Sequence, residues 1–205
     1  MIPKLYYEDA HVTLYCGDCR EILPELGTFD LLLTDPPYGI GEDGGSQRTR
    51  CSKRTNGPKL GWDFERPSKE TFDMMMSITK NQIIWGGNYF ADMLPASRGW
   101  LYWQKLMGGD FSDGELAWTS RNAVLKEFTK AKQTANRLHT TQKPVQLFQW
   151  CLNFYPDSQR VIDPFAGSCT TGVAAKLEGR HATLIEISER YCEIGAERLR
   201  QGVLF

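Results

Sequence analysis

Residues 31–40, LLLTDPPYGI, bring a carboxylate, two prolines and a tyrosine together directly after an apolar run. The three leucines are typical of a buried strand in a parallel sheet. The prolines end that strand because they cannot continue its hydrogen bonding. Asp35 is therefore expected at the carboxyl end of a strand, where open α/β sheets bind their ligands. An ordinary Asp-Pro turn, with Tyr38 beyond it, is the alternative.

A second segment, VIDPFAGSCTTGVAA at 161–175, predicts a strand, a tight turn and a helix. Asp163 would end the strand, and Gly167 would let the backbone come close to a ligand. No Gly-Lys-Ser/Thr follows, so the segment is not a phosphate-binding P-loop. The hydroxyls that could cap the helix or donate to a carboxylate are those of Ser168, Thr170 and Thr171.

Glu186 ends the next predicted strand, in the segment LIEIS. An acid roughly 20 residues after such a turn binds ribose hydroxyls in nucleoside-binding α/β folds. A helix-capping acid is the alternative for Glu186 taken alone. Its spacing from Asp163 favours a nucleoside site.

Three motifs occur in order: DPPYG at 35–39, TQKPVQL at 141–147 and DPFAGSCTT at 163–171. Each is weak alone, but in this order and spacing the sequence resembles the amino-methyltransferases of nucleic acid. Those enzymes methylate the exocyclic amino group of adenine or cytosine with S-adenosylmethionine. The catalytic motif precedes the cofactor motif, as in their β group, a circular permutation of the usual methyltransferase chain. The likeness extends from CGDC to LIEIS, nearly the whole protein.

The resemblance implies a chemical role for the first motif. An adenine amino nitrogen is a poor nucleophile because its lone pair is delocalised into the ring. If Asp35 and the Pro36 carbonyl each accept one amino hydrogen, the lone pair can point at the sulfonium methyl group. Transfer is then an in-line displacement aided by orientation. Pro36 and Pro37 would hold both acceptors in place, and Tyr38 would stack on a base turned out of the duplex.

Carried over position by position, the resemblance assigns a second group of residues to the cofactor. Asp163 and the turn after it would hold the methionine end, and Glu186 the ribose. Asp18 and Cys19 would lie by the adenine, and Lys143 would face the cofactor carboxylate. The residues expected to bind S-adenosylmethionine are Asp18, Cys19, Asp35, Lys143, Asp163, Phe165, Ala166, Gly167, Ser168, Thr170, Thr171 and Glu186.

One position departs from the family pattern, which usually reads Gly-Ser-Gly. Here Cys169 follows Gly167 and Ser168. If that position requires a positive φ, cysteine costs on the order of 1 kcal/mol or more. Its side chain could also crowd the cofactor, which leaves an inactive binding protein open. We expect the cysteine to be tolerated.

The predicted substrate is adenine N6 in DNA, because Asp rather than Ser at position 35 favours adenine within the family. Cytosine N4 and RNA are open alternatives with the same chemistry. A catalytically silent nucleic-acid-binding module of the same fold is a third. A role in restriction-modification is one context for such an enzyme.

Basic residues are clustered although the net charge is only −1. Residues 47–59 hold five basic residues and no acid, and residues 121–143 hold six against Glu127. Local basic segments favour contact with a polyanion, and solvated loops are the alternative. The expected contacts to duplex DNA are Arg48, Arg50, Lys53, Arg54, Lys59, Arg121, Lys130, Lys132 and Arg137.

Strands that alternate with helices must position these residues, which predicts a doubly wound α/β sheet. The resemblance implies a mostly parallel, seven-stranded Rossmann-like sheet with one antiparallel strand. We expect one domain over 1–205, with a catalytic half at 1–104, a small target-recognition insertion at 105–139 and a cofactor half at 140–205. The expected strands are 11–18, 29–34, 82–85, 100–104, 115–119, 123–128, 160–163 and 181–187. The expected helices are 18–26, 69–80, 88–94, 144–155, 170–177 and a last one to about residue 200.

Composition sets the remaining expectations. No stretch approaches the ~20 apolar residues of a membrane span, and the first residues lack the apolar centre of a signal peptide. Six cysteines without a secretory signal indicate a reduced, cytoplasmic protein. The resemblance implies a prokaryotic or phage protein associated with the nucleoid. Cys16 and Cys19 form a lone C-x-x-C, which predicts no metal site. Because β-group enzymes are often dimers, the resemblance implies a homodimer as one arrangement.

Overall fold

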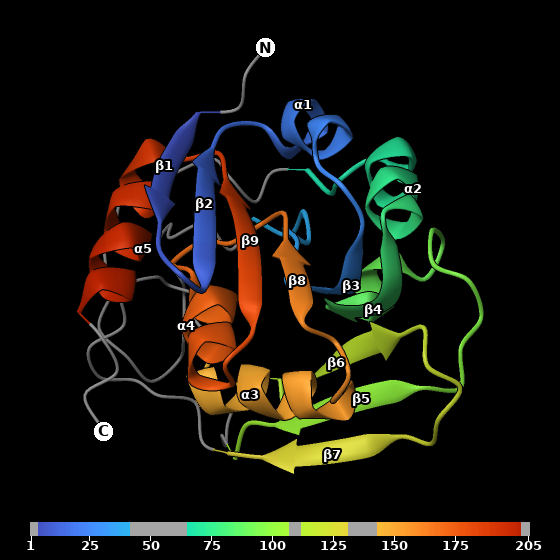
Figure 1. Ribbon diagram of the computed structural model, residues 1–205. Coiled ribbons are helices and arrows are strands. Elements are labelled where there is room, and N and C mark those ends of the chain that lie inside the picture. The colour runs from blue at the N-terminus through green and yellow to red at the C-terminus, as the bar shows by residue number, and fades with distance from the viewer. Residues whose placement is uncertain (1–3, 42–64, 107–111, 131–142, 202–205) are drawn as a thin grey trace, which may run out of the picture.

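The computed structural model describes residues 4–41, 65–106, 112–130 and 143–201. Within them the strands form one sheet of nine in the order β1-β2-β9-β8-β3-β4-β6-β5-β7, with helices on both faces (Figure 1). The strands are β1 (Leu5–Glu8), β2 (Val12–Cys16), β3 (Phe29–Thr34), β4 (Thr79–Trp85), β5 (Trp100–Gln104), β6 (Gly114–Thr119), β7 (Lys126–Thr129), β8 (Arg160–Asp163) and β9 (His181–Glu186). The helices are α1 (Cys19–Ile22), α2 (Lys69–Ser77), α3 (Val145–Phe154), α4 (Thr170–Leu177) and α5 (Glu189–Arg200), with 3-10 turns η1 (Leu23–Glu25) and η2 (Gly87–Phe90).

Five neighbouring strands, β2, β9, β8, β3 and β4, run parallel to one another. β6 is antiparallel to both β4 and β5, and β1 is antiparallel to β2. The doubly wound α/β prediction is thus confirmed. The expected number of strands was wrong, because the described residues form nine strands rather than seven, and two of them rather than one oppose the rest. β1 was missed because it is a short edge strand with no fully buried residue, so it carries no apolar alternation.

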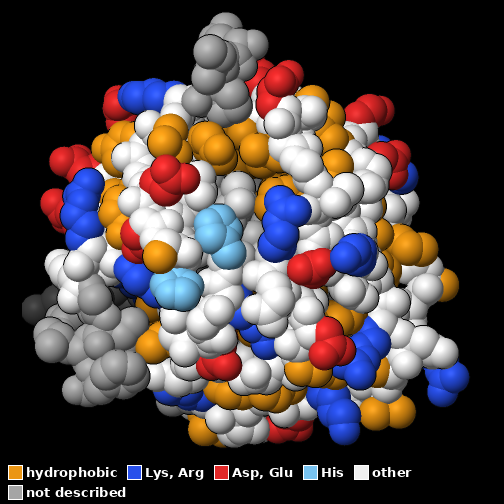
Figure 2. Space-filling view, in the orientation of Figure 1, with side chains coloured by type: hydrophobic (Ala, Val, Ile, Leu, Met, Phe, Trp, Pro, Cys, Tyr) orange, Lys and Arg blue, Asp and Glu red, His pale blue; other side chains and the backbone are white. Residues whose placement is uncertain are grey.

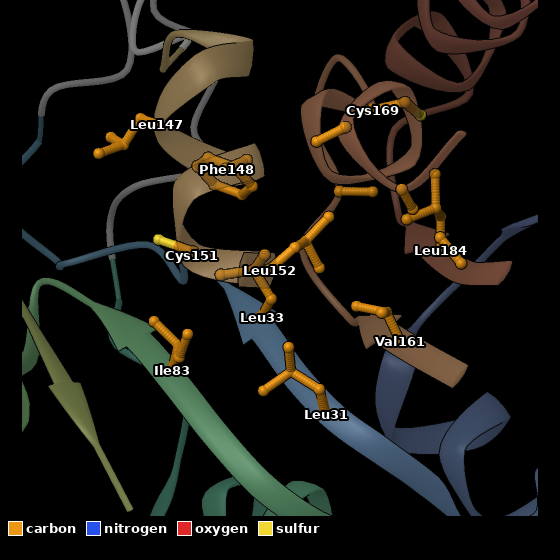
Figure 3. Packing of buried hydrophobic residues seen from close by; sticks show 14 of the residues in the cluster. Leu31, Leu33, Ile83, Leu147, Phe148, Cys151, Leu152, Val161, Cys169 and Leu184 are labelled. Atoms are coloured by element: carbon orange, nitrogen blue, oxygen red, sulfur yellow. The ribbon is translucent and has the colours of Figure 1, made fainter. Parts of the chain in front are cut away.

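The leucine run of β3 fills both layers of the core, since successive side chains of a strand point to opposite faces. Leu31 and Leu33 pack beneath α3 together with Ile83 and Val161 (Figure 3). Leu32 points to the other face, into the cluster that α1 and α2 cover. All three leucines are fully buried. β3 is therefore an interior strand with no freedom to shift its register.

Two predicted elements differ from the observed ones. The helix expected at 88–94 is the single 3-10 turn η2, because Gly86 begins it in the left-handed region with φ +69°. The strand expected at 123–128 lies at 126–129, where it pairs in parallel with β5. The expected recognition insertion, 105–139, contributes β6 and β7 to the main sheet.

Cys169 precedes α4 with φ 60°, so this position does adopt the conformation that glycine favours. Its side chain is fully buried against α5. A Cβ atom added to Gly195 of α5 would lie 2.3 Å from the Cys169 Sγ. The thiol therefore fills space that Gly195 leaves. Because it points into the core, it does not line the cavity described below.

This contact predicts a coupled pair of substitutions. Gly195→Ala should lower the free energy of unfolding by about 1–3 kcal/mol, because the new methyl group would overlap the thiol. In a Cys169→Gly background the same change should cost at least ~1 kcal/mol less. Urea denaturation of the four proteins measures the coupling. Gly27→Ala is the control, since the added carbon would lie 4.0 Å from the nearest atom, the end of the Arg160 side chain. Additive effects of Gly195→Ala and Cys169→Gly would contradict the contact.

Candidate active site

A cavity of about 730 Å³ opens where the parallel strands end. This volume is in the range of small-molecule sites. The ends of β2, β3, β8 and β9 contribute to its wall, because parallel strands carry their carboxyl ends to one edge. The structure brings together here every residue that we expected to hold the cofactor: Asp18, Cys19, Asp35, Lys143, Asp163, Phe165, Ala166, Gly167, Ser168, Thr170, Thr171 and Glu186.

Asp163 ties the end of β8 to its neighbours. Its Oδ1 accepts hydrogen bonds from Thr34 Oγ1 at 2.7 Å and from the Phe165 amide at 3.1 Å. Its Oδ2 accepts from Thr171 Oγ1 on α4. Burial raises the pKa of Asp163 to about 6. These bonds fix the turn between β8 and α4 from the inside.

Glu186 connects two turns at the cavity wall. Its Oε2 accepts from the Gly167 amide and its Oε1 from the Ser188 amide, both at 2.8 Å. Burial raises the pKa of Glu186 to about 7. A carboxylate has about four acceptor positions, so each oxygen can accept one further hydrogen bond from a ligand. Two neighbouring hydroxyl groups of a ligand could donate these two hydrogen bonds.

Two further residues around this part of the cavity were not predicted from sequence. Ile187, directly after Glu186, lines the cavity and is 66% exposed, so it offers an uncovered apolar surface. Its place in LIEIS, next to the predicted ribose acid, was a signal that could have identified it. Arg198 of α5 donates to the Ser168 carbonyl at 2.9 Å and to Thr170 Oγ1 at 3.0 Å. It supports the turn from behind, which no local sequence pattern indicates.

Asp35, Tyr38 and Lys143 form a compact cluster beside this wall. Tyr38 Oη donates to Asp35 Oδ1 at 2.5 Å, and Lys143 Nζ is ion-paired with Asp35 Oδ2. Lys143 Nζ also lies 3.3 Å from Tyr38 Oη. Pro36 is buried, and Pro37 lines the cavity. Lys143, which we expected to face a cofactor carboxylate, therefore contacts the DPPY carboxylate in this structure.

Glu115 and Lys105 extend this cluster, and the sequence analysis missed both. Glu115 Oε2 lies 3.1 Å from Lys143 Nζ, and Glu115 Oε1 lies 2.5 Å from Lys105 Nζ. Despite burial, the two lysines lower the pKa of Glu115 to about 2. Glu115 lies near the start of β6, which is antiparallel to β4, so the amino end of β6 meets the carboxyl ends of the parallel strands. The sequence pattern predicts a strand here but not its direction, so it could not place Glu115 in this cluster.

The ring of Tyr38 lies in an aromatic pocket after β4. It stacks on Tyr89 of η2 with centroids 4.6 Å apart, and Phe90 contacts it edge-on at 6.0 Å. A Cβ atom on Gly86 would lie 2.1 Å from Tyr38 Cε1. Glycine at position 86 therefore makes room for this ring.

The expected DNA contacts are only partly within the described residues. Lys130 follows β7 at the edge of the sheet where the cavity opens. Arg121 lies at the opposite edge, where it donates to the Phe154 carbonyl and lies 4.9 Å from the Phe154 ring. Arg121 thus contacts the end of α3, and its contact with DNA stays a prediction. Outside the described residues lie Arg48, Arg50, Lys53, Arg54, Lys59, Lys132 and Arg137.

The described surface adds two observations. On the face shown in Figure 2, basic and acidic side chains are interspersed rather than separated into patches of one sign. Among residues 4–41, 65–106, 112–130 and 143–201, no three His, Cys, Asp or Glu side chains are grouped to hold a metal ion. In the same ranges, no helix has the length and apolar character needed to span a bilayer.

Known proteins resemble this chain in sequence and in fold. Residues 115–197 match the N6-adenine/N4-cytosine family model described as DNA methylase. The chain is 24% identical to the Type II methyltransferase M2.LlaDCHI of Lactococcus lactis subsp. cremoris. The alignment covers 100% of this chain and 95% of that protein. The chain is therefore similar in sequence to DNA methylases of the N6-adenine/N4-cytosine type. Its fold is also found in solved structures.

Two of those structures show how closely the fold is shared. The M1.HpyAVI-SAM complex has a TM-score of 0.60 and 16% identity, and the match covers 92% of this chain and 98% of that one. The PvuII DNA methyltransferase, described as cytosine-N4-specific, has a TM-score of 0.66 and 16% identity over 96% and 89% of the two chains. These two structures share the fold of this chain and do not separate adenine from cytosine as a target base.

The burial of Glu186 predicts a pH-dependent stability. Its folded pKa of about 7 lies above the usual 4.5, so its contribution is fully present below pH 4.5 and is lost as the pH rises through 7. The cost of Glu186→Gln should therefore shrink by about 3 kcal/mol between pH 4.5 and 7.5, at ~1.4 kcal/mol per pH unit. Urea denaturation across this range measures it. Glu193→Gln, an exposed change on α5, is the control, and a pH-independent cost for Glu186→Gln would contradict the assignment.

Proposed function

We propose that this chain transfers a methyl group from S-adenosylmethionine to the exocyclic N6 of adenine in DNA, with the base turned out of the duplex. One observation carries the proposal: Asp35 of the DPPY motif lines the same cavity as Asp163 and Glu186. A carboxylate suited to bind an amino group thus lies beside groups suited to bind a nucleoside. A reaction between the two ligands needs this proximity.

The cavity residues fit the cofactor part by part. Glu186 would accept hydrogen bonds from the two ribose hydroxyls of the cofactor. The exposed side chain of Ile187 would cover the cofactor's adenine ring near Asp18. The turn held by Asp163 would bind the methionine end. When bound, S-adenosylmethionine supplies an electrophilic methyl group on a sulfonium. The core-facing direction of the Cys169 thiol supports this fit, because it removes the steric objection that the sequence raised.

Asp35 and the Pro36 carbonyl would orient the amino group of the target base. Each accepts one amino hydrogen, so the nitrogen lone pair turns out of the ring plane and toward the methyl group. Negative charge on Asp35 also stabilises the positive charge that develops on nitrogen. Tyr38, with its neighbour Tyr89, would supply the aromatic surface for the base. No covalent intermediate with the protein is needed.

Adenine is preferred over cytosine because position 35 is Asp, and the cytosine-N4-specific structure among the similar proteins keeps cytosine as the second candidate. DNA contacts would come from the basic residues at 47–59, Lys130, Lys132 and Arg137. The division into a catalytic half, a recognition insertion and a cofactor half is part of the proposal. So is a homodimer, which would enlarge a short recognition segment.

A transfer assay tests the proposed reaction. Protein is incubated with methyl-labelled S-adenosylmethionine and duplex DNA, single-stranded DNA or RNA, and the product nucleosides are then separated. N6-methyladenine from DNA is the expected product. N4-methylcytosine would move the target to cytosine, label in RNA alone would move the substrate to RNA, and no label in any nucleic acid would reject the enzyme.

Asp35→Ala should reduce transfer at least ~10²-fold, the usual effect of losing the group that orients a reactant. The fold should persist, because Lys143 retains Glu115 as a partner 3.1 Å away. Asp73→Ala removes an exposed carboxylate of α2 and should leave the rate unchanged. The measurement is single-turnover transfer with circular dichroism as the folding check. Near-normal transfer by Asp35→Ala would disprove its role as acceptor.

The basic cluster at 47–59 should account for part of the salt dependence of DNA binding. Each phosphate contact contributes ~0.9 to the log–log slope on duplex DNA. Replacing Arg48, Arg50, Lys53 and Arg54 with alanine should therefore weaken binding and flatten the slope by about two to four units, while S-adenosylmethionine affinity stays the same.

A matched quadruple variant controls for net charge. Lys80, Arg98, Lys126 and Arg160 are exposed at the edge of the sheet opposite the cavity, and their replacement with alanine should leave the slope nearly unchanged. Fluorescence anisotropy across a salt series measures both variants. Equal slopes for the two quadruple variants would show that the 47–59 cluster makes no specific contact with phosphate.

A further inference from the structure

Four charged side chains form an alternating chain from the cavity into the neighbouring strands: Asp35, Lys143, Glu115 and Lys105. Lys143 Nζ contacts Asp35 Oδ2 and lies 3.1 Å from Glu115 Oε2, and Lys105 Nζ lies 2.5 Å from Glu115 Oε1. Lys143 is the most buried, with a side chain only 5% exposed. Two cations and two anions balance within the described part of this cluster.

The carboxylate of Asp35 already has a partner on each oxygen. Tyr38 Oη donates to Oδ1, and Lys143 donates to Oδ2. Each oxygen keeps a second acceptor position, but an amino group of a substrate base that binds at Oδ2 would lie beside the Lys143 ammonium. A charged ammonium beside the reacting nitrogen also opposes the positive charge that develops there. Lys143 is thus the partner whose withdrawal favours the reaction.

A buried ammonium cannot simply lose its counter-ion, because an unpaired buried charge is strongly unfavourable. Glu115 supplies the second counter-ion. It lies near the amino end of β6, beside the end of β4, where the pairing of Trp85 with Ala117 fixes its position. Lys105 holds the other oxygen of Glu115. Glu115 Oε2 accepts no hydrogen bond from the described residues. A small movement of Lys143 can therefore form one, while its aliphatic part stays in place.

We propose that Lys143 occupies the acceptor carboxylate of Asp35 in the free protein, and that Glu115 is the positioning residue that takes Lys143 over when the substrate base binds. The inference rests on the proposed function. The exchange moves a hydrogen bond and no proton: Lys143 keeps its three hydrogens, and Asp35 Oδ2 exchanges the ammonium for the amino group of the base. Lys143 thereby balances the charge of Asp35 while no base is bound.

The charges around Asp35 give the proposal a distinctive pH dependence. The ionisable groups that face Asp35 are Lys143, Glu115, Tyr38 and, on β8, Asp163. Burial raises the pKa of Asp35, Lys143 opposes that rise, and Glu115 adds to it. Removing the charge of Glu115 should therefore lower the pKa of Asp35, and removing Lys143 should raise it. The low-pH limb of the pH–rate profile for methyl transfer should therefore move in opposite directions when Glu115 or Lys143 loses its charge.

The test compares single-turnover transfer at saturating S-adenosylmethionine across pH for Glu115→Gln, Lys143→Met and the wild type. Glu115→Gln should lower the rate at least ~10-fold, because Asp35 then attracts the Lys143 ammonium more strongly than the neutral amide does. It should also move the acid limb to lower pH. Lys143→Met should move the limb to higher pH. The affinity of Glu115→Gln for S-adenosylmethionine, measured by calorimetry, should stay near the wild-type value. Glu127→Gln, the same charge change on exposed β7, is the control.

Carboxyl ¹³C chemical shifts provide a readout that needs no activity. The titration of Asp35 should move down in Glu115→Gln and up in Lys143→Met. Glu115→Asp keeps the charge one methylene further away and should give an intermediate rate; it also serves if Glu115→Gln does not fold.

The two proposals can fail separately. The exchange alone is overturned if the wild type methylates DNA and Glu115→Gln transfers at the wild-type rate. It is also overturned if the acid limbs of Glu115→Gln and Lys143→Met move in the same direction. A wild type that transfers no methyl group overturns the proposed function, and the ¹³C titrations then decide the exchange by themselves.

Discussion

The parallel pairing of β3 between β8 and β4 is the constraint on which the site depends. It brings Asp35 and Asp163 to the same edge of the sheet, and β9 adds Glu186. Acids this close together in a buried place repel one another unless each is partnered. Asp163 is held by hydroxyl and amide donors, Glu186 by amides, and Asp35 by Lys143. Carboxyl groups thus remain at the cavity wall, where they would suit a cationic cofactor such as a sulfonium.

The partners differ in a way that matches the proposed roles. The donors to Asp163 and Glu186 are short hydroxyl and backbone groups that belong to the turns themselves, so these carboxylates are fixed. The partner of Asp35 is a lysine, whose side chain is long and has a second carboxylate within reach. A site that binds its cofactor rigidly and its substrate base by exchange of a partner needs this difference.

The sequence was sufficient to predict the residues that end parallel strands, because an acid after a short apolar run marks such an end. Asp35, Asp163 and Glu186 were placed correctly at one edge for this reason. Glu115 was not predicted, because a strand pattern does not reveal strand direction, and only the antiparallel course of β6 brings its amino end to the cavity. The position of Arg121 could not be predicted for the same reason, since it follows the other end of β6. The fit between Cys169 and Gly195 depends on how α4 and α5 pack, which no local pattern indicates.

The central claim is that Asp35 receives the amino group of the base that is methylated. A crystal structure with duplex DNA and an unreactive analogue of S-adenosylmethionine tests it most directly. The account predicts a base turned into the cavity, its amino nitrogen within hydrogen-bond distance of Asp35 and ~3–3.5 Å from the atom that replaces the methyl group, with Lys143 bonded to Glu115. A flipped base whose amino group binds elsewhere, while Lys143 still occupies Asp35, would contradict it.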